Sequence, residues 1–239
     1  MNEFSRLTGV FFEPGRTFAD IAERPSWLVP LLLVIVGALA FYSLYGQHVG
    51  WERAVRHQLE TNARAQQQME RIPAEKRDAA IALQVKFMGI GYYFGTIVMV
   101  PLMCVISAAI VLGIASGMMS AGVKFKQVFA IVCYAGLPGV LKNGLAIVVM
   151  FLKSPDEFNL ANPLAFNPAA FMDPINSSKF LYTLAMSFDL FTIWTILLTA
   201  VGLKAAAGKR LTFGGALFAV VLPWAILVLA GASLASLFS

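Results

Sequence analysis

Lys142 and Asp189 are the charged side chains that lie inside long apolar stretches of this sequence. A charge in the hydrocarbon of a bilayer costs at least about 2.5–3.5 kcal/mol on insertion scales, so each needs a partner, a water-filled cavity or a function. Two interpretations are open. The first is a buried or snorkelling ion pair that fixes the register of neighbouring helices. The second is a proton or substrate site.

Prolines and polar side chains near these two charges extend the candidate site. Pro138-Gly139 comes just before Lys142, and a proline inside a span frees backbone carbonyls that need another hydrogen-bond donor. Polar backbone at that depth can form a binding site. The candidate intramembrane polar site therefore consists of Lys142, Asp189, Tyr134, Pro138, Asn143 and Trp194.

Long apolar stretches must position these residues. A bilayer core about 30 Å thick takes roughly 20 apolar residues to cross as a helix. Apolar residues make up 59% of the chain and charged residues 13%, a balance that a soluble core of this size could not bury. We predict an all-α membrane protein, a five-helix transmembrane bundle within residues 27–239. The predicted spans are 27–45, 87–115, 127–152, 180–203 and 214–238.

Three segments outside the spans have patterns of their own. Residues 1–26 are predicted to be an amphipathic segment in the headgroup plane, with Thr17 as the cap of a short second helix. Residues 46–86 alternate charges at four-residue steps opposite an apolar face, which predicts an extramembrane helical hairpin. The loop 153–179 carries four prolines among apolar side chains, so we expect it to lie against the bilayer or the bundle, with one or two short helices.

Charge and residue types exclude several classes of function. The net charge of +5 is spread over tails and loops, so we expect the lipid bilayer as a partner and no nucleic acid. His48 and His57 lie in a polar segment without a metal-ligating cluster, and neither accompanies an intramembrane serine. No phosphate-binding glycine loop is present. We predict no enzyme activity, no catalytic residue, no metal and no cofactor.

The short polar segments between spans favour a cytoplasmic amino terminus and a carboxyl terminus outside, because they carry more Lys and Arg on the inner side. The first 26 residues contain no apolar core followed by a cleavage site, so we expect no removable signal peptide. Insertion would then depend on the first span itself.

Short motifs along most of the chain resemble the Yip1 domain family. They are FEPGRTF at 12–18, PSW at 25–27, FKQVF at 125–129, YAGLP at 134–138, DLFTIW at 189–194 and Gly202-Leu203. On this resemblance Tyr134, Pro138, Asp189 and Trp194 are family-like positions.

The resemblance implies five spans and an integral membrane location. Eukaryotic members of the family lie in the Golgi and endoplasmic reticulum and associate with Rab-type GTPases through a long amino-terminal region. The short tail and long hairpin of this chain resemble instead the bacterial branch, of which some members are associated with ABC-type exporters. We therefore expect a bacterial inner-membrane protein and no Rab-type GTPase partner.

Two hypotheses about function follow from these observations. One is a non-enzymatic scaffold, assembly or regulatory partner of a membrane complex, which binds a membrane protein or a second copy of itself through the hairpin and the proline-rich loop. The other is a small transporter or lipid-handling protein that uses the polar site around Lys142 and Asp189.

Overall fold

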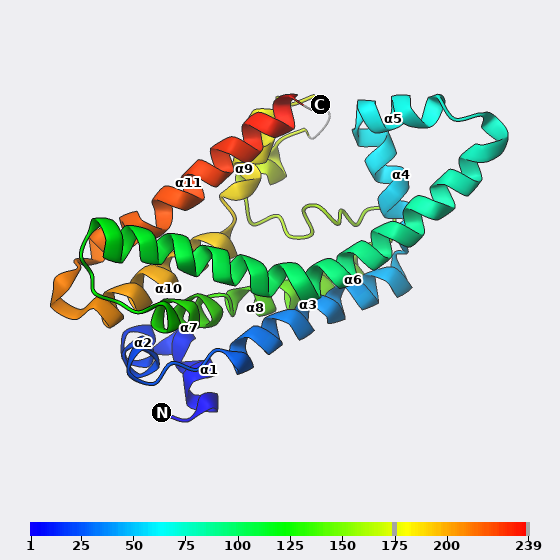
Figure 1. Ribbon diagram of the computed structural model, residues 1–239. Helices are drawn as coiled ribbons and strands as arrows, with labels where there is room; N and C mark the ends of the chain where they lie inside the picture. Colours follow the sequence, from blue (N-terminus) through cyan, green and yellow to red (C-terminus); the bar gives the residue numbers. More distant parts are fainter. Residues whose placement is uncertain (174–175, 238–239) are drawn as a thin grey trace. The chain divides into compact units, whose positions relative to one another are not determined.

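Helices make up the regular structure of this protein in the residues that the computed structural model describes, 1–173 and 176–237 (Figure 1). Pro174, one of the four prolines of the predicted loop, and residue 238 of the predicted fifth span lie outside these ranges. Five segments of the described residues are long and apolar enough to cross a bilayer, which confirms the predicted span count. They are Leu28–His48, Ala74–Met118, Phe125–Leu152, Leu190–Arg210 and Phe213–Leu237.

The first, second and fifth spans are each formed largely by one long helix. These are α3 (Leu28–His48), α6 (Ala74–Leu112) and α11 (Phe213–Leu237). Pro101 and Pro223 lie inside α6 and α11, and a π-helical turn, η1 (Gly113–Met118), extends α6. The bounds of α3 and α11 lie within a few residues of those predicted. The helix α6 starts at Ala74, thirteen residues before the predicted start of the second span at 87.

The third and fourth spans differ from single continuous helices. The third consists of α7 (Phe125–Ala135) and α8 (Pro138–Leu152), with the break at the predicted Pro138. The predicted fourth span, 180–203, is interrupted at Phe188 and Asp189. These two residues separate α9 (Lys179–Ser187) from α10 (Leu190–Ala207), and the helix able to cross a bilayer begins only at Leu190. A short turn, η3 (Gly208–Arg210), follows α10.

The segments outside the spans are also helical in part. The chain begins with α1 (Glu3–Phe12) and α2 (Pro14–Glu23). The predicted hairpin contains α4 (Trp51–Thr61) and α5 (Ala63–Glu70), and its last part is the start of α6. Asn62 separates α4 from α5 because its side chain accepts hydrogen bonds from the backbone N–H groups of Arg64 and Ala65. The proline-rich loop contains one 3-10 turn, η2 (Pro168–Phe171).

The chain divides into two compact units, each assembled from three stretches of sequence. The first unit consists of Met1–Gly37, Ile97–Leu141 and Leu190–Leu227. The second consists of Ala38–Thr96, Lys142–Asp189 and Val228–Ser239.

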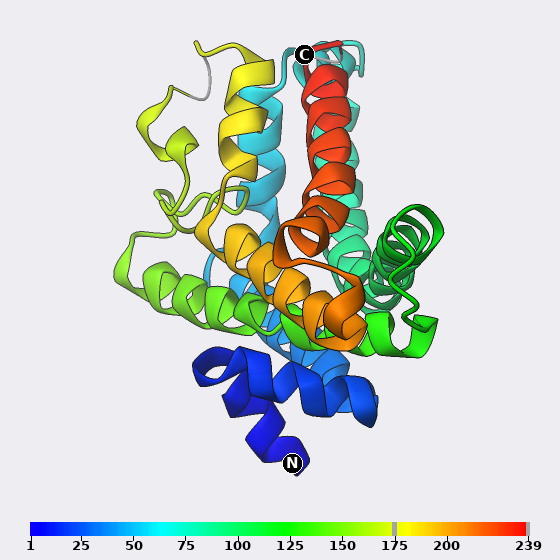
Figure 2. The ribbon, with the colours of Figure 1, turned by 90° about the vertical axis from the view of Figure 1, so that its left-hand side faces the viewer.

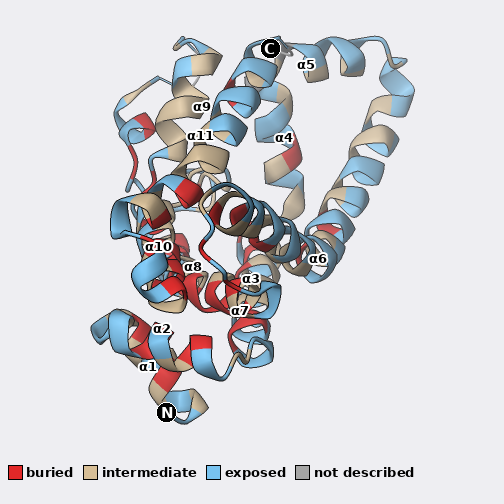
Figure 3. Ribbon diagram, turned by 60° about the vertical axis from the view of Figure 1, so that its left-hand side comes forward, coloured by how far each residue is buried: buried red, intermediate tan, exposed pale blue. Residues whose placement is uncertain are grey.

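In the first unit, one apolar core is formed by α6, η1, α7, α10 and α11, and another lies where α1 and α2 pack on α7 and α10 (Figures 2 and 3). Phe18 and Ile21 of α2 are fully buried there, together with Ile131 of α7. Gly202 of α10 permits this close approach, since a Cβ atom at this position would lie 2.5 Å from Ile131 and 2.9 Å from Phe18. The amphipathic face of residues 1–26 is therefore used in helix packing, while a location in the headgroup plane stays a prediction.

The predicted cap at Thr17 is wrong. The second helix, α2, begins at Pro14, and Thr17 lies inside it, fully buried. Proline suits the first helical turn because its missing N–H would have no partner there. Gly9 of α1 leaves room for the Thr17 hydroxyl, which a Cβ atom at that glycine would meet.

Aromatic side chains form the core of the second unit around Trp51. The Trp51 ring stacks on Tyr92 with the ring centroids 5.1 Å apart, and it also contacts Tyr45 at the same centroid distance. Gly46 and Gly89 make this possible, because a Cβ atom at either would lie within 3.2 Å of the indole ring. Trp51 thus attaches the start of α4 to the end of α3 and the middle of α6.

Candidate functional site

Lys142 and Asp189 contact each other within the second unit. The Lys142 Nζ atom donates a hydrogen bond to Asp189 Oδ2 at 3.1 Å. The Asp189 side chain is only 5% exposed, whereas that of Lys142 is 34% exposed. The two charges predicted to need partners therefore form an ion pair that is buried at the carboxylate and partly open at the amine.

The local sequence explains where the Asp189 carboxylate lies. Asp189 directly precedes Leu190, the first residue of α10, and so occupies the N-cap position of that helix. Aspartate is favoured there because its oxygen can accept backbone N–H groups and because the helix dipole is positive at this end. Asp189 thus marks the break between α9 and α10 as well as the acidic half of the pair.

Tyr134 belongs to a different cluster, in the first unit, which we call the amino-terminal network. Its hydroxyl donates to Glu3 Oε2 at 2.5 Å and lies 3.2 Å from Ser26 Oγ. Arg6 donates through Nη1 to Ser26 Oγ at 2.8 Å and through Nε to Asp20 Oδ2 at 2.7 Å. The five residues link α1, α2 and the start of the first span to α7.

Electrostatics in this network favour the charged forms. Burial lowers the pKa of the Arg6 guanidinium, but the hydrogen bond and charge of Asp20 outweigh this and the pKa is raised. The terminal ammonium of Met1 is the main cause that lowers the pKa of Asp20, and Arg6 adds to it against the effect of burial. Burial raises the pKa of Glu3, but hydrogen bonds from Tyr134 and Ser26 and the charge of Arg6 bring it below its usual value.

The remaining predicted site residues are distributed over both units. Trp194 lies in the first unit, where its ring meets Phe11 of α1 edge-on at a centroid distance of 5.5 Å. Pro138 is also in the first unit and starts α8, and Asn143 is in the second unit and half-buried. The structure brings together Lys142 with Asp189, and separately brings Tyr134 and Trp194 to the amino-terminal helices. A single site made of all six residues stays a prediction.

Sequence reasoning missed four members of the amino-terminal network: Glu3, Arg6, Asp20 and Ser26. A signal for Arg6 was present, because Arg6 and Val10 stand four residues apart and so share one helix face. An arginine is almost never fully buried unless it is paired, so Arg6 indicates an acidic partner wherever this face packs on protein.

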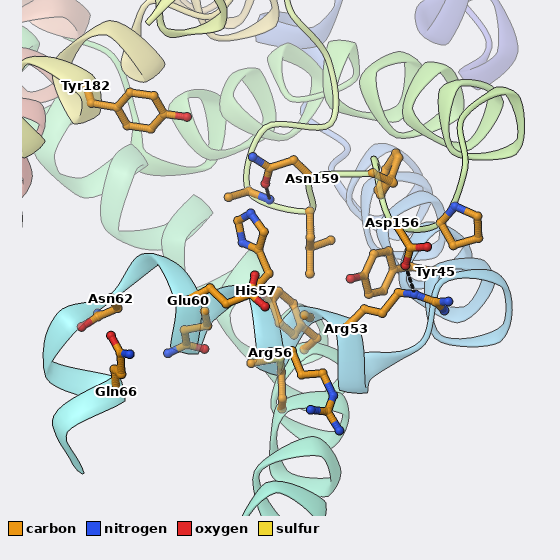
Figure 4. Close-up of a pocket in the computed structure, with 18 of the residues that line it drawn as sticks. Tyr45, Arg53, Arg56, His57, Glu60, Asn62, Gln66, Asp156, Asn159 and Tyr182 are labelled. Atoms are coloured by element: carbon orange, nitrogen blue, oxygen red, sulfur yellow. Dashed lines mark hydrogen bonds and ion pairs between the residues drawn. The ribbon is translucent and has the colours of Figure 1, made fainter. Parts of the chain in front are cut away.

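A cavity of about 920 Å³ in the second unit was also not predicted (Figure 4). Its walls come from α4 and α5, the loop at 155–161, the start of α9, the middle of α6, and the ends of α3 and α11. His57 and Glu60 of α4 line it opposite Asn159 of the loop, and Arg53 donates to Asp156 Oδ1 at 2.7 Å at one edge. The helical hairpin and the proline-rich loop therefore contribute most of the lining of one open-sided cavity.

Among the described residues, no group of three or more His, Cys, Asp or Glu side chains is arranged to hold a metal ion. Cys104 and Cys133 are free thiols.

Comparison with curated proteins and with solved structures finds no match. A family model described as the Yip1 domain matches residues 8–234. The matched range contains the second half of α1, the first four spans, the fifth span as far as residue 234, and the motifs that meet around Tyr134 and Trp194. Because this match covers nearly the whole chain, the protein belongs to the Yip1 domain family and is an integral membrane protein.

Proposed function

We propose that this protein is a non-enzymatic scaffold, assembly or regulatory partner of a membrane complex. The observation that carries this proposal is the joint structure of α4, α5 and the proline-rich loop, which line a large cavity and present a polar exterior. Buried Val55 and the stacked Trp51 hold α4 in a defined position. A fixed polar surface outside the spans suits recognition of a partner, because little conformational entropy is lost on binding.

The partner and the membrane are part of the same proposal. An ABC-type exporter in the bacterial inner membrane is the candidate complex, with the amino terminus of this chain cytoplasmic and the carboxyl terminus outside. The distribution of Lys and Arg over the short segments supports this orientation. A second copy of the chain is the other candidate partner.

The test compares complexes purified from native membranes in mild detergent. One version replaces residues 50–72 by a short flexible linker, and a second carries Glu52→Arg and Gln68→Arg, two exposed positions that leave Trp51 and Val55 unchanged. We expect a stoichiometric partner with the intact protein and its loss in both versions. A control with Phe4→Ser and Phe12→Ser, two exposed side chains of α1, should keep the partner. Absence of any partner from the intact protein would contradict the proposal.

A second candidate function rests on the uneven burial of the Lys142–Asp189 pair. An amine that is one-third exposed beside a buried carboxylate can exchange its partner for a substrate or a proton-linked group. A small transporter or lipid-handling protein would lose activity in Asp189→Asn while its folding is kept. Transport measured in proteoliposomes, together with the melting temperature of the same sample, separates this outcome from simple destabilisation.

A further inference from the structure

The cavity of the second unit is lined by two chemically different sets of side chains. The first set is apolar or aromatic and comes from α3, α6 and the loop: Tyr45, Met88, Tyr92 and Phe158. The second set is charged and comes from α4, the loop and the start of α9, with three cations, Arg53, Arg56 and Lys179, against two carboxylates, Glu60 and Asp156. A ligand that matches both sets is amphipathic and carries a negative charge.

Three members of the apolar set belong to helices that are able to cross a bilayer. Tyr45 belongs to α3 and both Met88 and Tyr92 to α6, within two of the candidate spans. Trp51 stacks on Tyr92 and packs against Tyr45, so the aromatic wall is held from behind and has little freedom to collapse. Hydrocarbon placed against this wall would reach the cavity at the boundary of the bilayer.

Arg53 and Arg56 of the charged set can bind an anion at a small cost in free energy, because only exposed ion pairs must open. Arg53 contacts Asp156 and Arg56 contacts Glu52, but all four side chains are about half exposed or more. Ion pairs of this kind contribute about 0–1 kcal/mol, so they can open for a better acceptor. A phosphate is such an acceptor, since guanidinium groups bind it through paired, charge-assisted hydrogen bonds.

We propose that this cavity binds a membrane phospholipid, with the phosphate at Arg53 and Arg56 and the start of the acyl chains against Tyr45 and Tyr92. The volume of about 920 Å³ lies in the range typical of small-molecule sites, about 300–1,000 Å³. This inference goes beyond the proposed function, because lipid in the cavity requires no protein partner. If the scaffold proposal is contradicted, the phospholipid site can still be present, and the reverse also holds.

The test asks whether both halves of a phospholipid are needed. The full chain in detergent is titrated with dioctanoyl phosphatidylglycerol, with glycerol 3-phosphate and with dioctanoylglycerol, and binding is followed by native mass spectrometry. We expect the phospholipid to bind at least about tenfold more tightly than either fragment. Glycerol 3-phosphate lacks the contacts with the apolar set, and dioctanoylglycerol lacks those with the arginines. Equal binding of glycerol 3-phosphate would identify a site for soluble phosphate esters instead. Equal binding of dioctanoylglycerol would identify an apolar groove. Either result, or no binding of any probe, overturns the proposal.

Variants locate the site. Arg53→Gln should weaken phospholipid binding by about tenfold or more, since it removes a charge-assisted contact to the phosphate. Met88→Asn tests the apolar set independently and should also weaken binding of the phospholipid, because it replaces an apolar contact by a polar amide. The matched control is Arg16→Gln, because Arg16 of α2 also forms an exposed ion pair, with Glu13 at 3.3 Å, in the first unit. Equal loss in Arg16→Gln, or unchanged binding in both cavity variants, would contradict the assignment.

Discussion

The amino-terminal network and the Lys142–Asp189 pair place charges in apolar surroundings in different ways. In the network Arg6 is 4% exposed and has hydrogen bonds to both Asp20 and Ser26, while Tyr134 connects the same cluster to α7. In the pair the Lys142 amine contacts the buried Asp189 carboxylate at 3.1 Å and still reaches the surface of the protein. A charge held by several partners fixes a structure, whereas a charge with one open side can change partner.

This difference has a consequence for the two units. The network connects α1 and α2 to α7 in the first unit, where apolar packing and polar contacts support the same arrangement. The pair joins α8 to the break before α10 in the second unit. We therefore expect variants of the network to act mainly on stability, and variants of the pair to separate stability from function.

The largest effect is expected for Arg6→Met. The free energy of unfolding should fall by about 3 kcal/mol, the lower end of the cost of breaking a buried ion pair, because Asp20 keeps some exposure and the Met1 ammonium. Chemical unfolding in mixed micelles measures this change. Arg16→Met, at an exposed pair on α2, should change stability by less than about 0.5 kcal/mol. Similar losses in both would show that the network is not the stabilising contact.

Unequal effects are expected for the two halves of the Lys142–Asp189 pair. Lys142→Met leaves a buried carboxylate without its amine and should cost about 2–3 kcal/mol. Asp189→Asn should cost only about 1 kcal/mol, since asparagine is an equally good N-cap and the Lys142 amine can reach water. The same unfolding assay compares the two variants. Equal costs would mean that the amine is as enclosed as the carboxylate.

A smaller effect is expected for Tyr134→Phe. The substitution removes the hydroxyl that contacts Glu3 and Ser26 but keeps the ring, so stability should fall by about 1–2 kcal/mol. Combining it with Arg6→Met should give less than the sum of the two losses, because both act on one network. Strict additivity in this double-mutant cycle would show that Tyr134 and Arg6 act independently.

The smallest effect is a dependence of stability on acid pH. The pKa values of Glu3 and Asp20 are lower in the folded state than their usual values of 4.5 and 3.8, so the unfolded chain binds more protons. This stabilisation is complete above those usual values and is lost as the pH falls through the lowered ones. Melting temperatures between pH 7 and pH 3 should fall less steeply for Asp20→Asn than for the wild type. Parallel curves would contradict this assignment.

Composition and periodicity predicted the five spans, because apolar length is the main physical requirement for crossing a bilayer. The break at Pro138 was predictable for the same kind of local reason, a missing backbone N–H. The break at Asp189 was not predicted. Residues 180–187 and those after Leu190 are apolar enough for one helix, and a lone aspartate between them fits either an N-cap or a charge inside a continuous span. In the structure Asp189 is the N-cap of α10 and pairs with Lys142.

The site was predictable only in part. Lys142 and Asp189 were predicted because they are charged side chains inside long apolar stretches, and in the structure they form an ion pair. The packing of residues 1–26 could not be distinguished from a location in the headgroups, because an amphipathic helix on a bilayer and one on a helix bundle have the same periodicity. The cavity is lined by side chains from segments far apart in the sequence, so no local sequence pattern could predict it.

The packing of α2 on α10 also sets an order for biosynthesis. The ribosome makes α2 among the first residues of the chain, whereas Gly202 and its neighbours, on which Phe18 packs, come after the third span has been completed. Until then the apolar face of α2 lacks its final partner, and contacts of such long sequence separation form slowly. A segment made before all five spans therefore reaches its native position only once α10 has been made, and a nascent chain arrested before α10 should still expose Phe18 and Ile21 to protease or to chaperones.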